Sequence, residues 1–152
     1  MAGICLIVTG FILWTTRTTI RSATAPEPSF KVAFLIGCAQ VLAILPGISR
    51  SGTTVAAALA LGVAPVAAAE FSFLMSVVAI AGAAVRSVPD LAAVPADRVL
   101  PLVTAASAAL IAGVAAIALF VRLLQTRGFH RFAYYTWAAG ALFLAWLAFG
   151  AA

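Results

Sequence analysis

The residues that could carry chemistry gather in one segment, residues 40–54. They are Gln40, Gly47, Ser49, Arg50, Ser51, Gly52, Thr53 and Thr54, and apolar residues flank the segment on both sides. An arginine at membrane depth costs at least roughly 2.5–3.5 kcal/mol, so it requires a partner or a ligand. A guanidinium, several hydroxyl groups and two glycines in one loop are suited to hold phosphate.

Each residue type in this segment has a physical role in such a site. Arg50 offers a planar fork of donors that matches phosphate oxygens, and the serines add hydroxyl donors. The glycines let the backbone approach a ligand closely. We expect Thr53 and Thr54 to open a helix whose N-terminus aims amide groups at the anion. The alternative is a polar loop at the membrane surface, with Arg50 reaching lipid headgroups.

The composition identifies the class of protein around this segment. Of 152 residues, 65% are hydrophobic and only 9% are charged. Apolar runs of this length predict an all-α polytopic membrane protein, because the alternating pattern of a membrane barrel is absent from the sequence. The net charge of +5 does not indicate nucleic-acid binding, since no basic cluster carries interleaved aromatics. Cys5 and Cys38 are expected to be small buried hydrophobes.

The apolar stretches predict about four transmembrane helices and one re-entrant hairpin of half-helices. Spans are expected at residues 2–16, 67–85, 99–121 and 132–150, the first of them short, and Tyr134, Tyr135 and Trp137 are expected to anchor the last at the interface. Residues 32–45 and 54–63 are too short to cross alone. We treat residues 1–152 as a single membrane domain with its hairpin at about residues 32–63.

Two topologies fit the short stretches, a re-entrant hairpin or one kinked span. With a hairpin, six basic residues share one side and two lie opposite. The six are Arg17, Arg21, Lys31, Arg122, Arg127 and Arg131, and the two are Arg86 and Arg98. With a single kinked span the division is five against three. The positive-inside rule favours the hairpin, with its base and the 122–131 loop in the cytoplasm.

The order of residues in the segment resembles a known signature. The string Gln40-x-x-Ala43-x-x-Pro46-Gly47-x-Ser49-Arg50-Ser51-Gly52-x-Thr54 is similar to that of bacterial undecaprenyl-diphosphatases, the bacitracin-resistance family. The similarity continues in Ala68-Ala69-Glu70-Phe71-Ser72-Phe73-Leu74 and, more weakly, in Phe132-Ala133-Tyr134-Tyr135.

This resemblance implies a fold and an activity. Members are built from two inverted repeats, each with a re-entrant hairpin, in the bacterial plasma (inner) membrane. They hydrolyse undecaprenyl diphosphate to undecaprenyl phosphate and phosphate, which recycles the lipid carrier for peptidoglycan and confers bacitracin resistance. By position, Arg50 corresponds to the essential phosphate-binding arginine, with Ser49 and Thr54 as the hydroxyl residues beside it, and Gln40 to a glutamine of the second repeat.

The resemblance covers only the C-terminal part of the family, and the first repeat is absent. A divalent metal, Mg²⁺ or Ca²⁺, is implied, but its acidic ligands belong to that repeat. The acids in this sequence are Glu27, Glu70, Asp90 and Asp97, and no pair has the spacing of a metal site on one helix face. His130, the sole histidine, is expected in a solvated loop. We therefore expect a fragment, or a half-length protein that pairs with a chain carrying the missing repeat.

Three readings of function remain open at this stage. The first is phosphatase action on a polyprenyl diphosphate lipid, with the tail against Phe71, Phe73 and Leu74. The second is half of a lipid flippase or transporter, because broken helices in inverted repeats are typical of transporters. The third is a helper subunit that binds the lipid without cleaving it. Release of phosphate distinguishes the first reading from the other two.

Overall fold

A computed structural model describes residues 1–92 and 94–149, and within them the chain is helical. The elements are α1 (Ala2–Ser22), α2 (Phe30–Leu42), α3 (Arg50–Ala60), α4 (Pro65–Ala92), α5 (Ala96–Gln125), the 3₁₀ turn η1 (Phe129–Arg131) and α6 (Phe132–Phe149). Helices α1, α4, α5 and α6 are long and apolar enough to cross a membrane. The prediction of an all-α, multi-pass membrane protein is confirmed. The predicted end of the last span, Gly150, lies outside the described residues.

The first span is longer than the sequence predicted. Helix α1 continues past Thr16 to Ser22, for 21 residues in total. Its final turns are polar in composition, but their hydroxyl groups donate to carbonyls three or four residues earlier. These residues are Thr15, Thr16, Thr18, Thr19 and Ser22. Because this bonding removes the need for water, the helix extends where the hydropathy pattern had ended.

Helices α2 and α3 form the predicted hairpin. They are 13 and 11 residues long, or about 20 and 16 Å at 1.5 Å per residue. The segment that leads into α2 is hydrogen-bonded to the segment that follows α3. The amides of Thr24 and Ala25 donate to the carbonyl of Gly62 at 3.0 and 2.9 Å, and the amide of Ala64 donates to the carbonyl of Ala25 at 2.8 Å. Both ends of the hairpin are therefore fixed at one place, which excludes a single kinked span.

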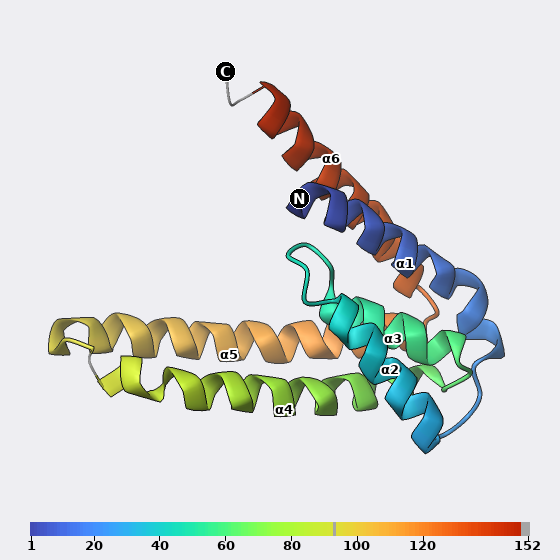
Figure 1. Cartoon of the computed structure of the whole chain (residues 1–152), viewed down its shortest axis with the longest axis horizontal. Coiled ribbons are helices and arrows are strands. Elements are labelled where there is room, and N and C mark those ends of the chain that lie inside the picture. The colour runs from blue at the N-terminus through green and yellow to red at the C-terminus, as the bar shows by residue number, and fades with distance from the viewer. Residues whose placement is uncertain (93, 150–152) are drawn as a thin grey trace.

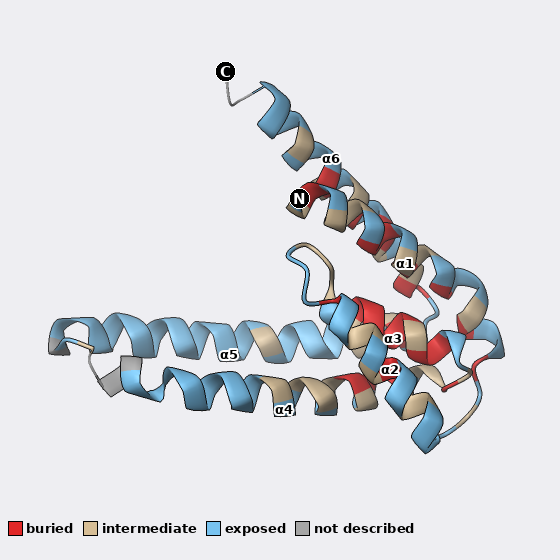
Figure 2. Ribbon diagram, in the orientation of Figure 1, coloured by how far each residue is buried: buried red, intermediate tan, exposed pale blue. Residues whose placement is uncertain are grey.

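Two long helix pairs diverge from a common end, with the hairpin between them (Figure 1). One pair is α1 with α6, and the other is α4 with α5. Buried residues concentrate at the junction, on α1, on α3 and on the start of α4, whereas the outer parts of α4 and α5 are exposed (Figure 2). Ile36, Val55, Leu59, Leu124 and Phe129 are the large apolar side chains of this core.

The distribution of basic residues follows the hairpin topology. The end of α1, the start of α2 and the η1 turn lie at the junction, and α1 contacts η1 there. Arg86 and Arg98 lie toward the opposite, outer end of the α4–α5 pair (Figure 1). The structure thus groups the cationic residues as the hairpin alternative required.

The prediction that both cysteines are buried was wrong: Cys38 is exposed on α2, Cys5 is half-buried, and both are free thiols. Trp137 is half-buried, and its indole N–H donates to the carbonyl of Ile7 at 3.2 Å. Tyr134 and Tyr135 are exposed, as interface residues should be.

Close packing of α1 on α6 depends on glycines. A Cβ atom at Gly10 would overlap the indole of Trp137, and one at Gly140 would lie 2.9 Å from the carbonyl oxygen of Gly3. Small residues let membrane helices approach closely, and van der Waals packing then holds them. Nothing lies within 4 Å of a Cβ built at Gly82 on the exposed part of α4.

We expect Gly10→Ala to destabilise the protein by about 1–3 kcal/mol, because the methyl group must displace Trp137. Thermal unfolding in detergent, followed by circular dichroism and tryptophan fluorescence, measures the change. Gly82→Ala is the matched control and is expected to be neutral or to stabilise by up to about 1 kcal/mol, as helix propensity dictates. Equal effects of the two substitutions would contradict the α1–α6 packing described here.

Candidate functional site

The loop between α2 and α3, residues 43–49, forms the tip of the hairpin. It lies beside the N-terminal part of α1, where Gly47 has a φ of +99° and its Cβ position faces the carbonyl oxygen of Ala2. A side chain at residue 47 would be both strained and blocked. The tip therefore lies within the depth that the spanning helix α1 covers.

Thr9 of α1 holds the loop in place. Its hydroxyl donates to the carbonyl of Gly47 at 3.0 Å and accepts from the amide of Ser49 at 3.1 Å, so one buried side chain satisfies two backbone groups. Sequence reasoning missed this residue. Its one signal was a hydroxyl in an otherwise apolar stretch, and its partners, 38 and 40 residues away, could not be read from the sequence.

The second half-helix begins at Arg50, three residues earlier than predicted. Ser49 is its N-cap, and the serine hydroxyl accepts from the amide of Gly52 at 3.1 Å. This cap fixes the helix start ahead of the threonines. Among the described residues, the amides of Arg50 and Ser51 have no hydrogen-bond partner. These amides and the positive end of the helix dipole thus remain available to an anion.

Arg50 and Gln40 line one cavity, of about 360 Å³, on the α2–α4 side of the loop. The other lining residues are Gly37, Val41, Ala43, Ile44 and Ala79, none of which is acidic. The side-chain carbonyl oxygen of Gln40 is buried and, within the described part of the chain, has no hydrogen-bond partner. An uncompensated guanidinium and an unsatisfied amide oxygen at one cavity are suited to an anionic ligand that also carries a hydroxyl or water.

Ser49, Ser51 and Gly52 line a second cavity, of about 220 Å³, on the opposite side of the loop. Its other walls are mostly apolar or aromatic and come from α1, the end of α5, η1 and α6. They are Leu13, Phe120, Phe129, Phe132, Tyr135 and the hydroxyl residue Thr136. The structure therefore separates the predicted site residues into a cationic side and a hydroxyl side, with the N-terminus of α3 between them.

Thr53 and Thr54 point into the protein. Thr54 is buried, and its hydroxyl is hydrogen-bonded to that of Ser72 on α4 and to the carbonyls of Arg50 and Ser51. The hydroxyl oxygen of Thr53 is buried and has no partner among the described residues. The resemblance implied a Thr54 hydroxyl beside the arginine, and the structure places that hydroxyl against the backbone carbonyl of Arg50, at the α3–α4 interface.

The acidic residues do not gather around Arg50. Glu70 and Glu27 line a separate cavity of about 310 Å³ at the hairpin base, and Asp97 lies at the start of α5; the side chain of Asp90 is outside the described residues. Within the described residues, no three potential ligands are close enough to hold a metal ion. The described residues thus do not form a site for the implied divalent metal.

His130 and the aromatic residues of the 68–74 segment pack against other parts of the protein or line its pockets. His130 is half-buried in η1 with its ring 6.0 Å from that of Trp14, rather than in a solvated loop. Phe73 packs edge-on against Phe120 at 5.3 Å, Phe71 lines the cavity at the hairpin base, and Leu74 is exposed. Of the three residues expected at the lipid tail, only Leu74 faces outward.

Comparison with known proteins connects this geometry to a family. The family model described as bacitracin resistance protein BacA matches residues 1–142. An undecaprenyl-diphosphatase of Methanothermobacter thermautotrophicus is 42% identical over 147 residues, covering 94% of this chain and 81% of that protein. One of Thermomicrobium roseum is 40% identical over 145 residues, covering 93% and 52%. One of Geobacter sulfurreducens is 37% identical over 150 residues, covering 97% and 56%.

Apart from the first of these, the chain spans about half the length of the curated relatives named here. No solved structure matches significantly. The match of the family model over residues 1–142, nearly the whole sequence, shows that the chain belongs to the BacA bacitracin-resistance family.

Proposed function

We propose that the chain provides the phosphate-binding side of a site that hydrolyses undecaprenyl diphosphate to undecaprenyl phosphate and phosphate. One observation carries the proposal: Arg50 stands at the N-terminus of α3, beside two free amides, in a cavity without acidic residues. The relatives named above are undecaprenyl-diphosphatases, and a diphosphate is a ligand of the charge that this site suits. The location that follows is the bacterial inner membrane, where a lipid carrier for the cell wall is recycled.

The chemistry of the proposal is transfer of the terminal phosphoryl group to water or to a hydroxyl. A bond forms between the incoming oxygen and the terminal phosphorus, and the bond from that phosphorus to the bridging oxygen breaks. Negative charge on the transferred group is stabilised by the Arg50 fork, the amides of Arg50 and Ser51, and the helix dipole. The Ser49 hydroxyl already accepts from the Gly52 amide, so its main task is to hold these donors in position.

The lipid tail has a path out of the cationic cavity. Val41 and Ile44 line the cavity and are 63% and 78% exposed. In a membrane protein, exposed apolar side chains of this kind contact lipid or a partner protein. We infer that the diphosphate enters beside Arg50 and Gln40 while the polyprenyl chain extends over these side chains, rather than over Phe71 and Phe73.

The metal and the general base would come from outside this chain. A divalent ion, Mg²⁺ or Ca²⁺, would neutralise phosphate charge when bound, but the described residues do not form its site. Its ligands would belong to the missing repeat or to a partner chain that carries it. The catalytic unit in this proposal is therefore the pair of repeats.

The test is phosphate release from undecaprenyl diphosphate by the purified chain with a divalent metal, alone and with a separately expressed N-terminal half of a relative. We expect Arg50→Ala to lower kcat/KM of the active assembly by about 10²–10³-fold, because a fixed donor to the developing charge is lost. Arg50→Lys should recover part of the loss, since the charge remains but the fork does not. Arg86→Ala, on the exposed part of α4, is the control.

The rival functions give different results in the same assay. A helper subunit would bind undecaprenyl diphosphate in an Arg50-dependent way and release no phosphate in any combination. A flippase half would move labelled lipid across a vesicle membrane without release. Full activity of Arg50→Ala would contradict the proposed role of the cavity.

The Thr9 contact predicts a second effect on activity. Thr9→Val keeps the shape of the side chain but leaves the Gly47 carbonyl and the Ser49 amide unpaired, at a cost of about 1–3 kcal/mol. We expect both lower thermal stability and lower phosphate release. Thr9→Ser retains the hydroxyl and should restore most of both. A Thr9→Val protein with unchanged activity would show that the loop does not depend on this clamp.

Thr54 is predicted to act through α4. Thr54→Val and Ser72→Ala each remove the same buried hydrogen bond, so each should destabilise by about 1–2 kcal/mol. The double variant should cost clearly less than the sum, because contacting residues are coupled. Unfolding midpoints of the four proteins complete the cycle. An additive result, with activity lost only in Thr54→Val, would instead indicate direct contact of Thr54 with the substrate.

A further inference from the structure

A second pocket with cationic walls lies at the C-terminal end of α1, away from the hairpin tip. It has a volume of about 380 Å³ and is lined by Trp14, Thr15, Arg17, Thr18 and Arg21. Thr9, which holds the tip, is eight residues before Arg17, or on the order of 12 Å along the helix axis. The phosphate-binding proposal makes no use of this pocket.

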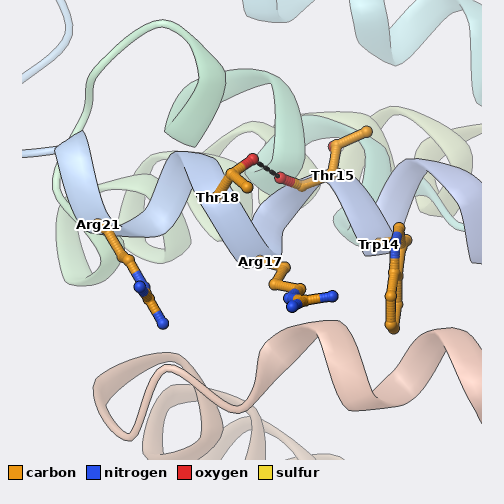
Figure 3. Close-up of a pocket in the computed structure, with 5 residues that line it drawn as sticks. All are labelled: Trp14, Thr15, Arg17, Thr18 and Arg21. Atoms are coloured by element: carbon orange, nitrogen blue, oxygen red, sulfur yellow. Dashed lines mark hydrogen bonds between the residues drawn. The ribbon is translucent and has the colours of Figure 1, made fainter.

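Trp14, Arg17 and Arg21 share one helix face because they are spaced three, four and seven residues apart. Figure 3 shows Trp14, Arg17 and Arg21 pointing to the same side of α1, toward η1 and α6, which are drawn in faint salmon. The Arg17 guanidinium carbon is 5.3 Å from the centre of the Trp14 ring, a cation–π distance. The ring itself is held edge-on by His130 at 6.0 Å and Tyr134 at 5.6 Å. The Trp14 wall of the pocket is therefore packed against η1 and α6, while the two arginines are exposed.

Positive charge in this pocket is not neutralised by the residues that line it. Arg17 and Arg21 are four residues apart, a like-charge spacing that destabilises a helix unless an anion lies between them. Within the described residues, Glu27 and Glu70 line a different pocket and Asp97 is at the start of α5. The helix dipole favours Arg21 in the last turn but offsets only part of two full charges. Arg131, in the adjacent η1 turn, adds a further cation.

We propose that this pocket binds the phosphate headgroup of an anionic phospholipid of the surrounding bilayer. A free phosphate has the same charge chemistry, but the surroundings are those of a membrane interface. Tyr134 is exposed beside the Trp14 ring, as in an aromatic belt. Phe11 lies one turn deeper on α1, three residues before Trp14, and is 60% exposed, so that an acyl chain can run over it. Basic pockets between membrane helices are suited to such headgroups.

Competition between lipids tests this proposal. The purified full chain is titrated with mixtures of phosphatidylglycerol and phosphatidylcholine in a neutral detergent, and retained lipid is measured by native mass spectrometry. We expect a preference for phosphatidylglycerol that Arg17→Gln/Arg21→Gln lowers about 10- to 30-fold, since each basic residue near an anionic surface contributes roughly a fivefold factor. Binding of phosphatidylcholine should not change.

Matched variants keep the test decisive. Arg86→Gln/Arg98→Gln removes two arginines at the far end of α4 and α5 and should retain the preference. The single variants Arg17→Gln and Arg21→Gln, each expected to lower the preference about fivefold, replace the double variant if its helicity by circular dichroism is reduced. The proposal is overturned if the pocket variants bind like the wild type or if the control loses the preference equally. It is also overturned if inorganic phosphate displaces the lipid when the two are present at equal concentration, because the pocket would then bind the free anion at least as well as the headgroup.

Discussion

Irregular backbone within the depth of a spanning helix must find hydrogen-bond partners inside the protein, and the hairpin tip depends on this constraint. Seven residues, 43–49, connect α2 to α3 beside α1. Thr9 pairs with a carbonyl and an amide of this loop, Ser49 caps the next helix, and Gly47 supplies a left-handed turn against the Ala2 carbonyl. Once these groups are paired, the first amides of α3 are those left for a ligand.

The same arrangement explains why the hairpin has two different faces. Arg50 follows the cap directly and extends to the α2–α4 cavity, while Ser49 and Ser51 face the aromatic cavity formed with α6. The next turn of α3 faces inward, where Thr54 meets Ser72. The role of each polar residue therefore depends on its position along this short helix. One can contact a ligand, another fixes the loop, and a third joins α3 to α4.

Charge is separated along the molecule in a way that suits a protein handling anionic lipids. The Arg50 cavity at the tip and the Arg17–Arg21 pocket on α1 are cationic and have no carboxylate lining among the described residues, whereas Glu27 and Glu70 line one pocket at the hairpin base. The outer parts of α4 and α5 bury almost nothing within the described chain.

By itself the sequence determined the class of protein, the four spans, the hairpin and the loop around Arg50, because hydropathy, Gly/Pro breaks and the positions of basic residues are local properties. It underestimated α1, since hydroxyls bonded to their own helix look polar in a hydropathy profile. Only the tertiary structure decided that Thr9 holds the loop, that Trp137 packs over Gly10 and bonds to the Ile7 carbonyl, and that the Thr54 hydroxyl meets Ser72. The hydrogen bonds among these contacts join residues 18 to 130 positions apart, and no local pattern encodes which distant side chain will meet a given group.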